Sequence, residues 1–183
     1  EYGACLALQQ DLHKDVVESG GGPYVVIVEH PPVLTFGKNA DRKFLLFAAA
    51  SLQAEGVAIV DTDRGGEVTA HEPGQLVAYP ILRLADYRLS ARSYVQALEG
   101  AVIRTLDLFG IRGATDPEHP GVWVGTRKIC ALGVRIKQRA TMHGLALNVT
   151  NSLALFDKIV PCGISGRGVT SMQKLLSDEI TVE

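Results

Sequence analysis

The chain has 183 residues, of which 46% are hydrophobic and 21% charged, a balance typical of one globular domain with a real core. The formal net charge of −2 excludes a global positive field, so we expect neither nucleic acid nor an anionic membrane as a partner. No apolar run reaches the roughly 18 residues of a membrane span. No signal-peptide pattern opens the chain, and we expect a cytoplasmic protein.

The cysteine pattern indicates free thiols. Cys5, Cys130 and Cys162 are widely spaced, odd in number and without a CxxC pair. This spacing argues against a disulfide framework and a structural zinc site, and it fits a reducing compartment. We therefore predict no metal site.

Taken in chain order, the apolar periodicities predict irregularly alternating helices and strands. Helices are predicted over residues 2–18, 44–55 and 90–109, the last with Ser90 as N-cap, and a short helix or turn over 151–156. Strands are predicted over residues 24–29, 33–36, 57–61, 76–82, 122–124, 128–136 and 142–148. Several adjacent strands favour an α+β fold, in which helices pack on a mixed, largely antiparallel sheet, over a doubly wound parallel sheet.

A glycine-rich segment, residues 64–75, precedes the strand at 76–82. It contains Arg64, the pair Gly65 and Gly66, then Thr69 and His71. Paired glycines let backbone N–H groups approach a ligand closely or take positive φ angles. The segment is neither a Walker A loop nor a dinucleotide fingerprint, since Gly-Lys-Ser/Thr and GxGxxG are absent. It indicates a ligand-binding loop, with a plain hairpin turn as the alternative.

Lys128 lies in an alternating segment, residues 125–133, that is typical of a strand. Strict alternation places Lys128 on one face with Cys130 and Leu132, while Arg127 and Ile129 point the other way. A lysine on such a small, apolar face is either held beside a site or extended into solvent from a sheet edge.

Cys162 stands between Pro161 and Gly163, a context that favours a loop. Loop thiols are accessible, and accessible thiols near a cation are the reactive ones; an inert cysteine is the alternative. Cys5 and Cys130 lie in apolar periodic runs, and we expect them to be structural.

Four ordered blocks resemble the lipoyl(octanoyl) transferase family of lipoate biosynthesis. They are residues 64–82 (RGGEVTAHEPGQLVAYPIL), 127–136 (RKICALGVRI), 143–149 (HGLALNV) and 160–172 (VPCGISGRGVTSM), and the resemblance covers essentially the whole chain. Members of this family, the octanoyl-[acyl-carrier-protein]:protein N-octanoyltransferases, move an octanoyl group from the thioester of acyl carrier protein to a lysine of a lipoyl-bearing domain.

The resemblance implies a single catalytic domain over residues 1–183 with a fold like that of biotin and lipoate ligase catalytic domains. It implies that Cys162 forms an acyl-thioester intermediate and that Lys128 lowers the pKa of its thiol. It also implies that the acyl pocket is lined by Arg64, Gly65, Gly66, Glu67, Val68, Thr69, Ala70, His71, Ala131, Leu132, Gly133, Gly144, Leu145 and Ala146. The chain departs from the family pattern at Glu72, where members often carry glycine, and at Cys130, where a smaller residue is expected.

The chemistry explains why these residue types are needed. The nucleophile is a thiolate, which a nearby ammonium stabilises. The same Lys128 can later accept a proton from the incoming amine, so ping-pong kinetics follow. No cofactor is expected, because the thioester is already activated.

The partners follow from the resemblance. Acceptors are lipoyl domains of 2-oxoacid dehydrogenase complexes and the glycine cleavage H protein, and the enzyme is expected to be a monomer. Because an acyl carrier protein is normally acidic, we expect a basic rim at the pocket mouth, with Arg42, Lys43, Arg64, Arg135, Lys137 and Arg139 as candidates.

Other functions stay open at this point. The chain could be an ATP-dependent ligase of the lipoate or biotin type, or a non-catalytic acyl-binding protein. It could also be a thioester hydrolase in which His71 or His143 activates Cys162.

Overall fold

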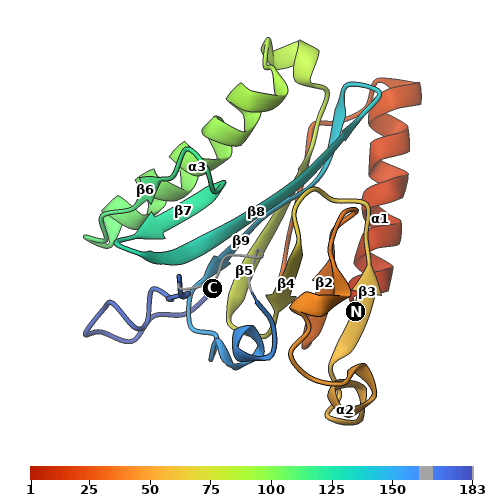
Figure 1. Cartoon of the computed structure of the whole chain (residues 1–183). Helices are drawn as coiled ribbons and strands as arrows, with labels where there is room; N and C mark the ends of the chain where they lie inside the picture. Colours follow the sequence, from red (N-terminus) through yellow and green to blue (C-terminus); the bar gives the residue numbers. More distant parts are fainter. Residues whose placement is uncertain (161–166, 183) are drawn as a thin grey trace.

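A sheet of six strands dominates the part of the chain that the computed structural model describes, residues 1–160 and 167–182 (Figure 1). The spatial order is β1-β5-β9-β8-β7-β6, and every neighbouring pair is antiparallel. The strands are Tyr24–Val28 (β1), Gln75–Ile81 (β5), Ala114–Thr115 (β6), Gly121–Val124 (β7), Arg127–Lys137 (β8) and Ala140–Asn148 (β9).

A smaller sheet, in the order β3-β2-β4, lies beside the lower half of the large one in the view of Figure 1. Its strands are Val33–Phe36 (β2), Ala58–Asp61 (β3) and Val68–His71 (β4). β2 pairs in parallel with β3 and antiparallel with β4. The predicted α+β class, a mixed and largely antiparallel arrangement with packed helices, is confirmed.

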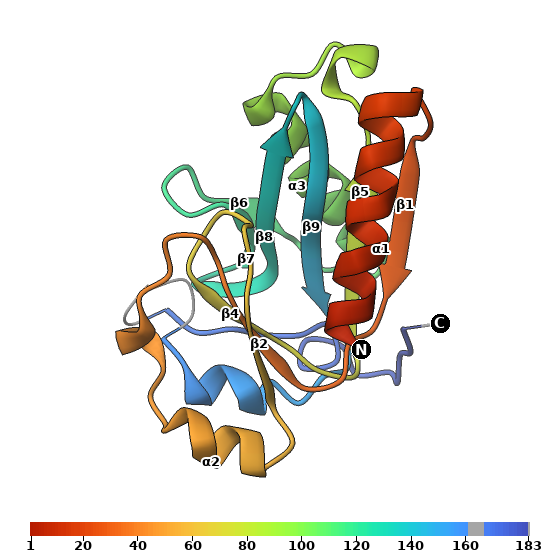
Figure 2. The ribbon, with the colours of Figure 1, turned by 90° about the vertical axis from the view of Figure 1, so that its right-hand side faces the viewer.

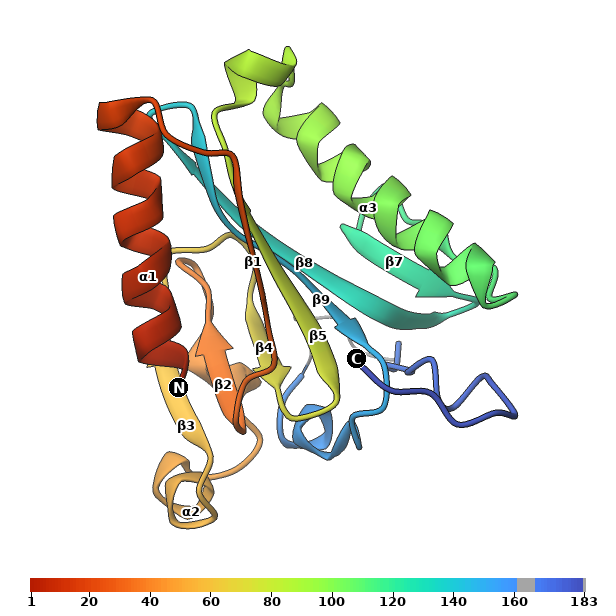
Figure 3. The ribbon, with the colours of Figure 1, turned by 180° about the vertical axis from the view of Figure 1, so that it is seen from behind.

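Two long helices cover opposite faces of the large sheet (Figures 2 and 3). Helix α1 (Tyr2–Lys14) continues as a π-helical turn over Asp15–Ser19, and Gly20 ends it at a φ of 72°. Helix α3 (Ala91–Leu108) lies across the other face. Ser90 caps α3 as predicted, because its hydroxyl accepts from the N–H of Ser93 while Ser93 Oγ accepts from the N–H of Ser90.

One predicted helix is much shorter than the sequence pattern suggests. Of residues 44–55, only Ala49–Ala54 (α2) is α-helical, while Arg42–Phe44 forms a 3-10 turn. The reason is tertiary pairing: Leu45 bridges Ile159, and the N–H of Leu46 donates to the carbonyl of Lys158. A short 3-10 turn also occupies Leu84–Tyr87, and another occupies Ala154–Lys158 near the predicted helix or turn.

The main core lies between α3 and the large sheet. Leu106 of α3 is fully buried there, and it packs in one cluster with Val122, Ile129 and Leu147 from three strands. This cluster fixes α3 on the sheet and thereby helps to fix β8, the strand that carries Lys128.

We predict that Leu106→Ala lowers the free energy of unfolding by about 2–5 kcal/mol, because it removes buried methyl groups and leaves a cavity. Leu108→Ala, on the same helix, is the matched control, since Leu108 is 85% exposed. Urea unfolding followed by circular dichroism measures both. Equal midpoints for the two variants would contradict this account of the core.

Candidate active site

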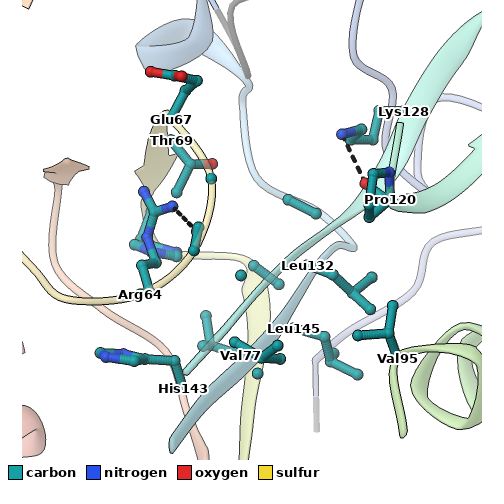
Figure 4. A pocket seen from close by; sticks show the side chains of 18 of the residues that line it. Arg64, Glu67, Thr69, Val77, Val95, Pro120, Lys128, Leu132, His143 and Leu145 are labelled. Atoms are coloured by element: carbon teal, nitrogen blue, oxygen red, sulfur yellow. Dashed lines mark hydrogen bonds between the residues drawn. The ribbon is translucent and has the colours of Figure 1, made fainter. Parts of the chain in front are cut away.

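A cavity of about 360 Å³ lies between the glycine-rich segment and the β8–β9 pair (Figure 4). Its floor is made of small residues that face each other across the two strands: Ala131 pairs with Ala146, and Gly133 pairs with Gly144. A Cβ atom at Gly133 would lie 3.0 Å from Cδ of Arg64. Larger side chains at these positions would therefore fill the cavity or displace the glycine-rich segment above it.

The roof of the cavity is the glycine-rich segment. The N–H of Gly65 donates to the carbonyl of Val134 at 2.9 Å, which ties the segment to β8. The Arg64 guanidinium is buried and donates to the carbonyl of Thr35 at 2.6 Å. Gly66 has a φ of 87°, a left-handed conformation that favours glycine. The segment is thus a structured cover anchored to both sheets, and it includes strand β4, which the sequence pattern did not predict.

Apolar side chains complete the walls. Val77 comes from β5, Leu132 from β8, Leu145 from β9 and Val95 from α3 (Figure 4). These four apolar side chains come from four different elements, and the walls that they form suit an alkyl chain.

The structure gathers nearly all residues that the family resemblance implied for the pocket. Residues 64–69, 71, 131–133 and 144–146 all line the cavity. Ala70 does not: it is fully buried in the core of the smaller sheet, paired with Leu34. Neighbouring residues of a strand point to opposite faces, so Ala70 is directed away from the cavity.

The sequence did not predict several of the lining residues. Among them are Tyr2, Val95, Glu118, His119, Pro120 and Val134. Tyr2 belongs to α1 and Val95 to α3, and in the sequence each has the pattern of an ordinary apolar position on a helix. Only the packing of distant elements brings them to the cavity, so no local signal identifies them.

Aromatic and imidazole rings line part of the cavity wall. The ring of Tyr2 stacks on that of His71, with 6.0 Å between centroids. Burial lowers the pKa of His71 to about 3 and raises the pKa of Tyr2 to about 12, so both are neutral near pH 7. His71 Nδ1 donates to Oε1 of Gln75 at 2.8 Å. This imidazole is a structural hydrogen-bonding group and a poor general base.

His143 has a different partner. Its Nε2 lies 2.9 Å from Oδ1 of Asp63, whose other oxygen lies 2.7 Å from Nη1 of Arg135. Burial lowers the pKa of His143, and the neighbouring Asp63 opposes that shift. Asp63 thus has both a histidine and an arginine as partners.

Lys128 is buried, with 7% of its surface exposed, and it lines the cavity. Its Nζ donates to the carbonyl of Pro120 at 3.0 Å (dashed in Figure 4) and lies 4.8 Å from the centroid of the Trp123 ring. A Cβ at Gly121 would lie 3.1 Å from Cε of Lys128, so glycine leaves room for the lysine stem. The alternative of a solvated strand lysine is wrong.

The predicted strand faces around Lys128 are also wrong. The pairing of β7 with β8 shifts register between Val122 and Trp123, so Val122 opposes Cys130 and Trp123 opposes Lys128. This bulge interrupts the alternation. Consecutive Ile129 and Cys130 both lie in the core under α3, while Lys128 faces the cavity.

Cys162 lies outside the described residues, so its distance from Lys128 stays a prediction. The described chain on both sides of it is well anchored. The N–H of Val160 donates to the carbonyl of Phe44, and the carbonyl of Gly168 accepts from the N–H of Lys128 at 3.0 Å. Thr170 then donates to the carbonyl of Lys128. The chain therefore passes directly along Lys128 six residues after Cys162.

The two departures from the family pattern have distinct environments. Glu72 is buried, and its carboxylate accepts from the N–H of Leu153 at 2.7 Å, from Nδ2 of Asn151 and from Oγ of Ser152. It joins the turn before β5 to the segment that leads toward residue 160. Cys130 is fully buried, and burial raises the pKa of its thiol to about 12, so it is a poor nucleophile.

Fewer of the candidate basic side chains are available for the predicted rim than the sequence suggested. Arg64 is buried in the roof rather than at a mouth. Three other candidates are paired with acids: Arg42 with Asp61, Lys43 with Asp41, and Arg135 with Asp63. Sequence clustering alone did not reveal these acidic partners.

Within residues 1–160 and 167–182, no helix combines the length and apolar character needed to span a membrane. No group of three or more His, Cys, Asp or Glu side chains there is arranged to hold a metal ion.

Comparison with known proteins gives a consistent picture. The family model described as "Lipoyl protein ligase A/B catalytic domain" matches residues 1–183. The octanoyltransferase of Alkaliphilus metalliredigens is 42% identical over 177 residues, which are 96% of this chain and 81% of that protein. The octanoyltransferase of Chloroflexus aggregans is 46% identical over 94% of this chain and 79% of that protein.

Solved structures share the fold at much lower identity. A bipartite lipoate protein ligase from Thermoplasma acidophilum superposes with a TM-score of 0.73 at 16% identity, covering 94% of this chain and 73% of that one. A lipoate-protein ligase A bound with ATP gives 0.74 at 16% identity, covering 94% and 74%. The predicted likeness to the lipoate ligase fold is confirmed.

We predict that Glu72→Ala lowers the free energy of unfolding by about 1–3 kcal/mol, because it leaves the N–H of Leu153 buried without an acceptor. Glu55→Ala is the control, since Glu55 is exposed and lies 3.9 Å from Lys158 in a surface ion pair. Chemical denaturation compares the two. If Glu72→Ala were as stable as Glu55→Ala, the carboxylate would not hold this turn.

Proposed function

The chain belongs to the lipoyl protein ligase A/B catalytic-domain family and is an acyltransferase of the octanoyltransferase kind, and we propose a two-step reaction for it. Cys162 first takes an octanoyl group from acyl carrier protein as a thioester. It then passes the group to a lysine of a lipoyl domain, with Lys128 assisting both steps.

The observation that carries this proposal is the position of Lys128 beside the cavity. A buried ammonium stabilises a nearby thiolate, because water screens its charge only partly. The carbonyl of Gly168, in the block that contains Cys162, accepts from the backbone N–H of the same lysine. This backbone contact supports a Cys162–Lys128 pair.

In the first step the Cys162 thiolate attacks the donor carbonyl, and the thioester bond of the donor breaks. The phosphopantetheine thiolate leaves and takes one proton from the Lys128 ammonium. The octanoyl chain then lies in the cavity over Ala131 and Ala146, where small side chains leave room.

In the second step the amine of the acceptor lysine attacks the Cys162 thioester. The amine must be neutral to attack, and it loses a proton as the amide forms. In this proposal Lys128, neutral after the first step, accepts that proton, and Cys162 departs as a thiolate. Release of the first product before the second substrate binds gives ping-pong kinetics.

The partners in this proposal are acyl carrier protein as donor and lipoyl domains as acceptors, including those of 2-oxoacid dehydrogenase complexes and the glycine cleavage H protein. A nucleophilic thiol has to stay reduced, which supports a cytoplasmic location. A hydrolase with His71 as base is less well supported, because burial lowers the pKa of that imidazole to about 3.

We predict that incubation with octanoyl-acyl carrier protein, without ATP, adds about 126 Da to the intact protein, the mass of octanoyl replacing hydrogen in an acyl-enzyme. Cys162→Ser abolishes the adduct, and Lys128→Ala slows its formation at least about 100-fold, since the thiolate loses its ammonium. His71→Ala and His143→Ala are the controls and keep the thioester. Absence of an adduct on a protein that transfers octanoyl would overturn the intermediate, and ATP-dependent transfer in Cys162→Ser would point to a ligase.

We also predict that Ala131→Leu shortens the acyl chain that the cavity accepts, because Ala131 lines the floor and three added carbons occupy the space. The ratio of octanoyl to butanoyl transfer should fall about 10-fold or more. Ala101→Leu, on the exposed face of α3, is the matched control. An unchanged ratio, measured by competing the two thioesters in one reaction, would mean that the acyl chain binds elsewhere.

A further inference from the structure

Glu99 is a buried carboxylate that the proposed reaction does not use. It lies on α3, on the side of the helix that packs against the sheet, and only 6% of its surface is exposed. Its Oε1 accepts from the N–H of Gly121 at 3.0 Å. Taking a carboxylate out of water is costly, so a buried carboxylate at this position is expected to have a specific role.

The partner of Glu99 leads directly to Lys128. The N–H of Gly121 and the carbonyl of Pro120 are two ends of one planar peptide group. That carbonyl accepts from Nζ of Lys128 at 3.0 Å. A carboxylate, a peptide group and an ammonium are therefore connected in a row by two hydrogen bonds.

This arrangement gives the carboxylate a way to act on the lysine. A hydrogen bond from the peptide N–H to a carboxylate polarises the peptide and strengthens its carbonyl as an acceptor. The planar group also turns as one body, so fixing the N–H fixes the direction of the carbonyl. The hydrogen bond that Glu99 accepts from the N–H of Gly121 therefore orients the carbonyl oxygen that accepts from Lys128.

The surroundings of Gly121 show that the Pro120–Gly121 peptide group packs closely against the side chain of Lys128. Gly121 has a φ of 135°, and a Cβ there would lie 2.7 Å from the carbonyl oxygen of Cys130 and 3.1 Å from Cε of Lys128. The backbone and the lysine stem are thus in close contact, and a small rotation of this peptide group would move the ammonium.

We propose that Glu99 is a positioning residue for Lys128, and that it acts through the Pro120–Gly121 peptide group to hold the ammonium toward the cavity. The proposal deepens the two-step reaction above and rests on it for the catalytic consequence. The position of the lysine itself can be measured without any turnover.

The first experiment is therefore a footprint of amine reactivity. The protein is treated briefly with N-acetoxysuccinimide, and acetylation of each lysine is followed by peptide mass spectrometry. We expect Glu99→Leu, which has no acceptor for the N–H of Gly121, to raise acetylation of Lys128 at least about 5-fold while the other lysines stay unchanged. Glu99→Gln retains an oxygen at the same place and should stay within about twofold of the parent. Asp107→Leu, on an exposed part of α3, is the matched control.

The second experiment measures single-turnover acylation of Cys162 by octanoyl-acyl carrier protein. In Glu99→Leu we expect the rate constant at saturating donor to fall about 10- to 100-fold, with the half-saturating donor concentration unchanged, because the acyl cavity is untouched. Glu99→Gln should recover most of the rate. In a Lys128→Ala background, Glu99→Leu should cost less than about twofold, since the residue that it positions is already gone.

These outcomes separate the possible failures. If acetylation of Lys128 is the same in Glu99→Leu and the parent, or if the rate losses of Glu99→Leu and Lys128→Ala simply multiply, Glu99 has only a structural role and the proposal is overturned. If acetylation changes as expected but the parent forms no octanoyl adduct, the positioning holds and the two-step reaction fails. Should Glu99→Leu not fold, Glu99→Asp serves instead, because its shorter carboxylate keeps the charge but withdraws it from the N–H of Gly121.

Discussion

The pairing of β8 with β9 is the interaction on which the rest of the structure depends. It runs in register from Cys130 opposite Leu147 to Lys137 opposite Ala140. One face of the pair carries Cys130 and Leu147 into the core under α3, while the other offers Ala131 and small partners to the cavity. A slip of one residue would exchange these faces, so that bulky side chains would fill the cavity and small ones would leave the core empty. Core stability and ligand space are therefore fixed by the same set of hydrogen bonds.

A register shift in the neighbouring pairing of β7 with β8 decides which way the side chain of Lys128 points. Without the register shift opposite Trp123, strict alternation would turn Lys128 toward the same side as Cys130, into the core under α3. The bulge allows two consecutive residues, Ile129 and Cys130, to remain in the core while Lys128 faces the cavity. Bulges are often found beside functional sites for this reason, since they redirect one side chain without disturbing the rest of a strand.

The sequence was sufficient for the parts of the site that depend on local pattern. Glycines at 65 and 66 predicted close backbone approach, and the cap at Ser90 predicted the start of α3. The sequence was insufficient where distant elements meet. It could not show that Ala70 turns away from the cavity, because β4 was not recognised as a strand, and it could not place Tyr2 from the first helix at the lining. The bulge was also hidden, because it arises from the pairing of two strands rather than from either strand alone.

The electrostatics of the lining follow from burial and suit an uncharged acyl chain. Tyr2 and His71 are both kept neutral near pH 7, since their pKa values are moved to about 12 and about 3. Ionising either one beside a bound alkyl chain would expose a charge with little water to solvate it. Lys128 lines the same cavity, and its Nζ donates to the carbonyl of Pro120. In the proposed reaction, a direct ion pair would offset the positive charge that stabilises the thiolate. A peptide group between Glu99 and Lys128 would instead orient the ammonium and leave much of its field available to the cavity.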